Sequence, residues 1–438
     1  MNWSDVTSLM TPGPGSTAIG TLIVGAGPAA LSVLHEASLH PGSVLRPICL
    51  IADAPLHRLG AGRLADYFVT SDTAGSVFLE VADVDGTALS PAGRVTAQNL
   101  LKACSTSDPV PRPTAAEVLA LGAGQLVDRL LTADNCVVIS GSVSRVWPAK
   151  GGFLTRVESA DKSLELHARH VVLAVGGRPW TPPRLEALVD SASTLIHSDA
   201  LLRRQSLPKD FGRVTIVGGA HSAFATATDL LANDPDHRLH EGAVRLVHRA
   251  PVRMTYSDVA TAVADGAAVS EHDVCLISKR VHRFAGLRGE SARLWQRARD
   301  GQERRVELVC AHNFETTARY CRGVDLAVAA TGYVKAAIDL LPGLFELDGD
   351  QRDRKPHPRI DRFGKFIQST GQPVDGLYCV GLGAGHRRVA GSGGEASFEG
   401  SVDGVWYYQK IVAPAVIASI TSPRTADSYT TAGMQTRS

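Results

Sequence analysis

The chain has 438 residues, of which 44% are hydrophobic and 20% charged. This length predicts two or three domains, and the composition excludes a disordered chain. The 45 Lys and Arg residues balance the 44 Asp and Glu residues to a net charge of +1, so no overall field draws the chain to nucleic acid or to a membrane surface. Seven scattered cysteines without a C-x-x-C pair argue against a disulfide framework and a zinc ribbon, and we expect a cytoplasmic protein without a metal.

Residues 1–19 are expected to form a flexible leader and residues 421–438 a flexible tail, because neither stretch has apolar periodicity. Between them, short β-branched runs alternate with longer segments that can form helices. Continuous apolar runs of this length are typical of parallel strands covered on both faces, so we predict an α/β fold. The strands are expected at 21–24, 48–51, 170–174, 214–217, 244–247 and 326–329.

The strand at 21–24 leads into Gly-Ala-Gly-Pro-Ala-Ala and then into an expected helix. This G-x-G-x-x-A spacing is typical of a dinucleotide-binding turn. Gly25 makes the turn, Gly27 lets the backbone approach a pyrophosphate, and Ala30 permits close packing of helix on sheet. The helix N-terminus would then hold the phosphates. The next strand ends at Asp53, whose carboxylate can accept hydrogen bonds from a ribose.

A second fingerprint, Gly-Gly-Ala-His-Ser-Ala, follows the strand at 214–217. Ala220 stands where a glycine is usual, although Gly219 beside it can relieve the crowding. The following strand ends in His248-Arg249 rather than in an acid. A guanidinium can form a bidentate, charge-assisted pair with a ribose 2′-phosphate, which predicts NADPH rather than NADH. The alternative is a surface arginine paired with a nearby acid.

Three further strands end in small residues, at 174–177, 330–333 and 381–383. There the backbone can pass close to a flat ligand or to a crossing chain. Together with His197-Ser198 and the two fingerprints, these segments occur in an order that resembles the two-dinucleotide-binding-domain flavoproteins. Within that superfamily the chain is similar to the class B flavin-dependent monooxygenases that hydroxylate nitrogen.

The resemblance implies two Rossmann-like domains, with an NADPH domain at 186–333 inserted into an FAD domain at 20–185 and 334–420. The residues expected at FAD are Gly25, Ala26, Gly27, Pro28, Ala29, Ala30, Asp53, Val143, Gly176, Gly381 and Gly383. The residues expected at NADPH are His197, Ser198, Gly218, Gly219, His221, Ser222, Ala223, Arg249, Thr331, Gly332 and Tyr333.

The chain also departs from several branches of this superfamily. It lacks the F-x-G-x-x-x-H signature of Baeyer–Villiger enzymes and the dithiol of disulfide reductases. Its stretch 384–400 does not match the C-terminal motif of siderophore N-hydroxylases, which leaves an amino-acid substrate open. Leu382 stands where an Asp is common in the third flavin motif.

A flavin beside a nicotinamide permits hydride transfer from the nicotinamide C4 to the flavin N5. The resemblance implies that a C4a-hydroperoxyflavin then oxygenates a small nucleophilic metabolite, chiefly by N-hydroxylation of an amine in secondary metabolism. The expected partners are therefore this metabolite and molecular oxygen, and a homo-oligomer is left open. Two alternatives remain: an NAD(P)H-dependent flavin reductase or dehydrogenase without oxygen insertion, and a non-catalytic nucleotide-binding redox sensor.

The segment after the second strand is expected beneath the flavin ring. Arg63, Tyr67 and Ser71 are therefore candidates for contacts with the ring or the substrate. The His-Arg-Arg run at 386–388 lies in a glycine-rich loop, where a cationic cluster can hold an anionic substrate group, and His386 is a fourth candidate. A solvated loop is the alternative.

Overall fold

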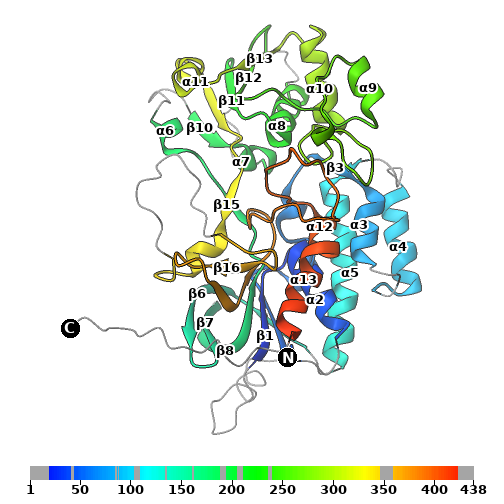
Figure 1. The fold of residues 1–438 in the computed structure, drawn as a ribbon, viewed down its shortest axis with the longest axis vertical. Coiled ribbons are helices and arrows are strands. Elements are labelled where there is room, and N and C mark those ends of the chain that lie inside the picture. Colours follow the sequence, from blue (N-terminus) through cyan, green and yellow to red (C-terminus); the bar gives the residue numbers. More distant parts are fainter. Residues whose placement is uncertain are drawn as a thin grey trace, which may run out of the picture.

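A computed structural model gives the fold of the described residues, in two main sheets, the first mixed and the second parallel, that lie one above the other in Figure 1. The predicted α/β class with two Rossmann-type units is confirmed. Residues 1–18 and 423–438, which hold most of the expected leader and tail, lie outside the described part. The described residues are 19–40, 44–83, 86, 88–102, 109–133, 136–159, 162–187, 194–204, 211–234, 239–345 and 359–422.

The first sheet contains the parallel strand order β17-β8-β1-β2-β5. β1 (Ile19–Val24) pairs with β2 (Ile48–Ala52) on one side and with β8 (Lys162–Leu173) on the other. Every residue of β1 and β2 is buried, as expected for strands covered on both faces. β5 (Cys136–Ser140) pairs with β2, and β17 (Pro373–Cys379), from the other end of the chain, pairs with β8.

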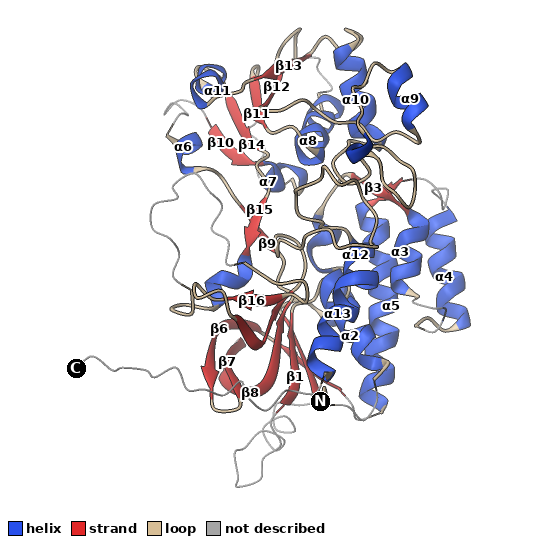
Figure 2. Cartoon of the chain, in the orientation of Figure 1, coloured by secondary structure: helices blue, strands red, loops and turns tan. Residues whose placement is uncertain are grey.

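Helices cover one face of the first sheet, as Figure 2 shows. α2 (Pro28–Ser38) contacts α5 (Arg112–Thr132) and α13 (Ala413–Thr421), and these helices share one apolar core with the sheet. Outside α5 lie α3 (Gly75–Ala82) and α4 (Pro91–Lys102).

The opposite face carries an antiparallel extension of the sheet. β6 (Ser142–Ala149) and β7 (Gly152–Ser159) form a hairpin that pairs with β8. β16 (Lys365–Ile367) pairs with β17 at the edge. A second apolar core fills this side, with Phe153 and Phe366 buried in it.

The second sheet is parallel throughout and has the order β10-β14-β11-β12-β13. All of its strands come from one continuous stretch of chain. They are β10 (Thr194–His197), β11 (Val214–Val217), β12 (Val244–His248), β13 (Val306–Cys310) and β14 (Leu326–Ala329).

Five helices accompany the second sheet, and α8 packs against α7 and α10. They are α7 (Ser198–Leu202), α8 (His221–Ala232), α9 (Val259–Ala264), α10 (Gly289–Arg299) and α11 (Phe314–Cys321). Across the described residues, no helix has both the length and the apolar character needed to cross a bilayer.

Two short strand pairs join the sheets. The chain leaves the first sheet through β9 (Gly177–Pro179) and returns through β15 (Tyr333–Lys335), and these two strands pair antiparallel. β3 (Thr70–Ala74) pairs with β4 (Pro109–Pro111) beside α10. The remaining short helices are α6 (Pro183–Glu186) and α12 (Val405–Tyr407).

Each sheet has a glycine turn that packs against the neighbouring strand end. Gly25 has a φ of +132°, and a Cβ there would lie 2.3 Å from the carbonyl oxygen of Ala174, just after β8. In the second sheet, a Cβ on Gly218 would lie 2.5 Å from the carbonyl oxygen of Ala330, just after β14. Both turns therefore require glycine, because any side chain would push the strand end away.

We expect Gly25→Ala to lower the free energy of unfolding by about 2–4 kcal/mol, because the alanine is strained at this φ and its Cβ overlaps Ala174. Denaturant titration measures the free energy of unfolding, and the flavin bound per protein is measured beside it. Gly124→Ala in α5 is the matched control, since a Cβ there meets nothing within 4 Å. Equal stability of the two variants would contradict the prediction.

Candidate active site

The turn between β1 and α2 opens onto free space. Gly27 is the N-cap of α2, no side chain caps the helix, and a Cβ on Gly27 would meet no atom within 4 Å. A Cβ on Gly176 would also meet none. Gly381 approaches the same helix, because its Cβ would lie 3.1 Å from that of Ala29. The uncapped N–H groups of α2 and the space beside Gly27 fit the pyrophosphate of FAD.

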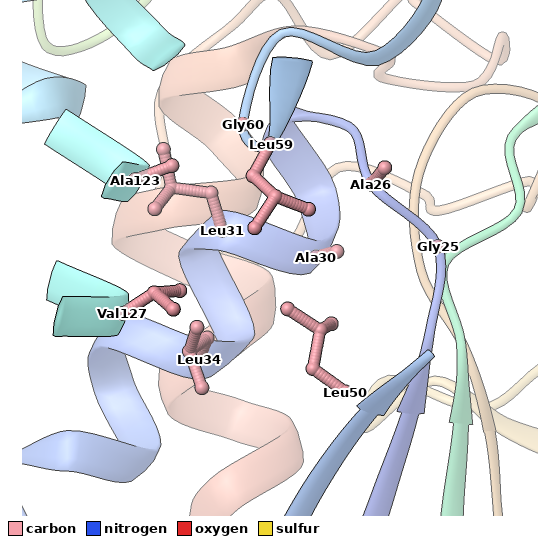
Figure 3. Close-up of a pocket in the computed structure, with 10 residues that line it drawn as sticks. All are labelled: Gly25, Ala26, Ala30, Leu31, Leu34, Leu50, Leu59, Gly60, Ala123 and Val127. Atoms are coloured by element: carbon pink, nitrogen blue, oxygen red, sulfur yellow. The ribbon is translucent and has the colours of Figure 1, made fainter. Parts of the chain in front are cut away.

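A small apolar pocket lies behind this turn (Figure 3). The loop 59–62 covers it: the N–H of Gly60 donates to the carbonyl oxygen of Ala26 at 2.8 Å, and a Cβ on Gly62 would lie 2.8 Å from the Cα of Gly27. This packing holds the turn in place. The pocket is lined by Gly25, Ala26, Ala30, Leu31, Leu34, Leu50, Leu59, Gly60, Ala123 and Val127.

The other residues expected at FAD lie around the same edge of the sheet. Pro28, Ala29 and Ala30 form the first turn of α2. Asp53 is exposed directly after β2, and Val143 is half-buried near the start of β6. Because β1, β2 and β5 are parallel, their C-terminal ends meet at this edge, where open α/β sheets bind their ligands. Gly383 lies farther along, with its Cβ position 3.0 Å from the carbonyl oxygen of Val334.

The second sheet repeats this arrangement at the end of β11. α8 begins after Gly218-Gly219-Ala220 and has no side-chain cap. The backbone at Gly219 lies against His248, since a Cβ there would be 2.9 Å from the His248 Cβ. Arg249 is exposed just beyond β12. The residues of the first turn of α8 are His221, Ser222 and Ala223.

His221 also contacts the FAD side of the molecule. Its Nε2 accepts the backbone N–H of Arg288 at 3.2 Å and lies 3.5 Å from a carboxylate oxygen of Asp72 in β3. Burial lowers the pKa of His221, while the Asp72 charge opposes this shift. Burial raises the pKa of Asp72, but the charges of His221 and Arg288 outweigh it and leave that pKa below its ordinary value. This group of three joins β3 to α8.

A buried carboxylate, Asp199, connects the two halves of the molecule. It accepts hydrogen bonds from the hydroxyls of Tyr67, before β3, and of Tyr333, in β15. Arg203 adds an ion pair at 3.3 Å. Burial, followed by the bond to Asp199, raises the pKa of Tyr67 to about 12, and burial also raises the pKa of Tyr333. Tyr67, expected at the flavin ring or the substrate, and Tyr333, expected at NADPH, therefore both bind the carboxylate of Asp199.

The segment after β14 is held by the linker at β9. The hydroxyl of Thr331 donates to the carbonyl oxygen of Trp180, and the backbone N–H of Trp180 donates to the carbonyl oxygen of Gly332 at 3.1 Å. The ring of His197 bonds to the same Gly332 oxygen at 3.2 Å. Ser198 is buried, and its hydroxyl has no hydrogen-bond partner in the described part of the chain. This unpaired hydroxyl, directly after β10 in the second sheet, fits a polar group of NADPH.

The other catalytic candidates differ in their surroundings. Arg63 is exposed, whereas Ser71 is buried and accepts the backbone N–H of Thr73. His386 is 4% exposed, and its ring packs edge-on to Tyr408. Burial, with the charge of Lys335, lowers the pKa of His386 to about 4. We interpret His386 as a neutral packing group rather than a substrate contact.

Sequence reasoning missed Asp199 and Arg203. Asp199 follows the His-Ser element directly and lies in the first turn of α7. An acidic residue at that position is the sequence feature that could have identified it. Arg203 pairs with Asp199 and also with Asp66, which lies 137 residues earlier in the chain. No local pattern marks that contact.

Two sheets with parallel central strands, each with a glycine turn and an uncapped helix at its C-terminal edge, fit a flavoprotein with two dinucleotide-binding sites. Residues 137–273 match the model of a family described as L-lysine 6-monooxygenase/L-ornithine 5-monooxygenase. Over 452 residues the chain is 29% identical to a CMP-5′-(3-aminopropyl)phosphonate hydroxylase of Streptomyces rubellomurinus, covering 94% of this chain and 99% of that protein.

Solved structures share the fold. An ornithine N-hydroxylase from Kutzneria sp. 744 superposes with a TM-score of 0.58 at 18% identity, covering 92% of this chain and 99% of that one. An FAD-bound cadaverine monooxygenase from Erwinia amylovora gives a TM-score of 0.57 at 16% identity, covering 92% and 95%. The comparisons confirm the resemblance stated from the motifs. The chain is an FAD- and NADPH-dependent oxidoreductase that is similar to the N-hydroxylating monooxygenases.

We expect His386 to make the protein less stable in acid. Its folded pKa of about 4 lies below the ordinary value of 6.5, so the unfolded chain binds this proton first as the pH falls. The contribution of neutral His386 to the free energy of unfolding is fully present above pH 6.5 and decreases by about 3 kcal/mol towards pH 4.

Denaturant titrations across this pH range measure the effect. His386→Gln should flatten the pH dependence, whereas His57→Gln, at an exposed histidine, should leave it unchanged. Parallel curves for the wild type and His386→Gln would contradict the interpretation.

We expect Arg249→Ala to raise the KM for NADPH by about 10- to 100-fold and to leave the KM for NADH nearly unchanged, because only NADPH carries the 2′-phosphate. Steady-state oxidation of the two coenzymes measures this ratio. Arg322→Ala, at an exposed arginine after α11, is the control for a lost surface charge. A similar loss with both coenzymes would assign Arg249 another role.

Proposed function

We propose that this enzyme N-hydroxylates a primary amine carried on a phosphonate or phosphate ester. The observation that carries the proposal is the alignment over nearly the whole of both chains with a hydroxylase of an aminopropylphosphonate nucleotide. The loop 384–400, which departs from the motif of amino-acid N-hydroxylases, supports a substrate other than a free amino acid. The reaction consumes one O₂, one NADPH and one proton, forms the N–O bond, and releases the second oxygen atom as water.

The two glycine turns support this reaction. The helix N-termini of α2 and α8 would hold the pyrophosphates of FAD and NADPH, and the spaces at Gly27 and Gly176 would admit the FAD chain. When bound, FAD accepts a hydride from NADPH and activates O₂. The hydrogen bonds from Tyr67 and Tyr333 to Asp199 hold the two halves of the molecule in register.

The interior beside the flavin glycines favours an uncharged amine. Lys335 in β15 is 2% exposed, and its Nζ lies 3.2 Å from the position of a Cβ on Gly385. Burial lowers the pKa of this ammonium group. An amine must lose its proton before its lone pair can attack oxygen, and the same desolvation lowers the pKa of a substrate amine placed here.

A cytoplasmic location agrees with this chemistry, since NADPH is a cellular coenzyme. The six cysteines in the described residues are free thiols, in agreement with a reducing compartment. The net charge of +1 gives no reason to add a nucleic-acid partner.

We expect NADPH to reduce the purified FAD enzyme without oxygen. With oxygen, CMP-5′-(3-aminopropyl)phosphonate or 3-aminopropylphosphonate should gain one oxygen atom in mass spectrometry, with NADPH oxidation coupled to product. Ornithine and lysine are the comparison amines.

Peroxide release without hydroxylated product for any amine would identify a flavin reductase instead. Hydroxylation of ornithine or lysine in preference to the phosphonates would retain the reaction and overturn the substrate class.

A further inference from the structure

We propose that Arg283 and Arg388 form the binding site for the phosphorus oxyanion of the substrate. The inference rests on the proposed function and adds the place in the fold that recognises the anionic end. Arg283 belongs to the segment between α9 and α10, and Arg388 to the glycine-rich loop 384–404. In Figure 1 this loop, in orange, lies between the two sheets before α12.

The two arginines flank the same pair of glycines. A Cβ on Gly393 would lie 2.2 Å from Nη1 of Arg283. A Cβ on Gly394 would lie 3.0 Å from Cδ of Arg388 and 2.2 Å from the ring of Phe284. Glycine at both positions therefore leaves room for the guanidinium of Arg283 beside Gly393 and for the side-chain stem of Arg388 beside Gly394.

Aromatic rings and a thiol hold Arg283 in place. Its guanidinium carbon lies 5.4 Å from the ring centroid of Phe284 and 5.6 Å from that of Trp406. Its Nη1 lies 3.7 Å from the sulfur of Cys275, which also accepts the Gly394 N–H. A guanidinium has five N–H donors, so this contact leaves others for a ligand.

Loop 384–404 is anchored by a carboxylate that does not pair with either arginine. Glu395 is fully buried and accepts the backbone N–H groups of Phe284 and Ala285, the shortest at 2.8 Å. Among the described residues, no carboxylate forms an ion pair with Arg283 or Arg388, whereas Arg203 has two such partners. Arg283 has the sulfur of Cys275 as a partner, whereas the half-buried Arg388 has no acidic partner among the described residues, and a cation in that state is costly unless an anionic ligand completes the site.

The position suits a substrate with one anionic and one reacting end. Arg388 follows Gly383 by five residues, so the two Cα atoms lie within about 18 Å of each other at full extension. Gly383 belongs to the third segment expected at FAD, and Lys335 lies near Gly385 of the same loop. A phosphonate held at Arg388 can thus direct an amine on a short chain towards the flavin. Arginine is suited to such a group because its planar fork matches two oxyanion atoms.

The test uses the FAD-loaded variants Arg283→Gln and Arg388→Gln, with Arg280→Gln as the control. Arg280 is exposed three residues before Arg283, so the control removes the same charge outside the site. Calorimetric binding and steady-state kinetics are measured with 3-aminopropylphosphonate and its CMP derivative. The rate of flavin reduction by NADPH is measured separately, without oxygen.

We expect each site variant to weaken phosphonate binding and raise its KM by about 10- to 100-fold. The kcat and the reduction by NADPH should stay close to those of the wild type, and Arg280→Gln should match it. Arg388→Lys should recover part of the affinity, because it restores the charge but not the fork. The wild type should also bind 3-aminopropylphosphonate more tightly than 4-aminobutanoate, and Arg388→Gln should lose this preference.

Unchanged phosphonate binding in both site variants would overturn the inference, even if the wild type hydroxylates the phosphonate. A raised KM for NADPH with unchanged phosphonate binding would overturn it too, and would assign the arginines to a coenzyme phosphate. If Arg283→Gln fails to retain FAD, Arg388→Gln and the phosphonate–carboxylate comparison decide. A wild type that hydroxylates ornithine or lysine but no aminophosphonate contradicts the proposed function itself.

Discussion

The close approach of each glycine turn to a neighbouring strand end is the constraint on which the rest of the structure depends. At Gly25 and at Gly218, backbone meets backbone where a side chain would not fit. The helix that follows each turn then begins directly at the C-terminal edge of its sheet, with its N–H groups uncapped. Those donors need an acceptor, which the pyrophosphate of a dinucleotide would supply. Coenzyme geometry thus follows from steric limits on two residues.

The parts of the fold that local sequence determines could be predicted. Apolar runs located the central strands, and glycine spacing located both turns, because those patterns depend on neighbours in the chain. Contacts between distant segments could not be predicted. Tyr67 and Asp199 are separated by 132 residues, and Glu395 meets Phe284 across 111. His386 illustrates a third case, since a glycine-rich, charged loop indicates exposure, yet tertiary packing buries its ring.

The distribution of charge distinguishes two regions of the molecule. Near the flavin glycines, burial lowers the pKa values of both Lys335 and His386, so this interior disfavours cations. At the segment 283–288 the charge is positive: the guanidinium of Arg283 lies beside Gly393, and Arg288 donates to the carbonyl oxygen of Arg283. A molecule with an anionic head and a basic tail is therefore sorted by electrostatics. On the proposed function, its head would stay with the guanidinium groups and its tail would enter as the free base.

The strand order of the first sheet limits the order in which the two sheets can form during synthesis. β17 joins β8 only after more than 370 residues have been made, and the glycines at 381 and 383 follow it. The second sheet is complete by residue 329. On a ribosome, the nicotinamide unit can fold while the flavin unit still waits for its last strand. Flavin binding at Gly381 and Gly383 would then have to follow the synthesis of β17.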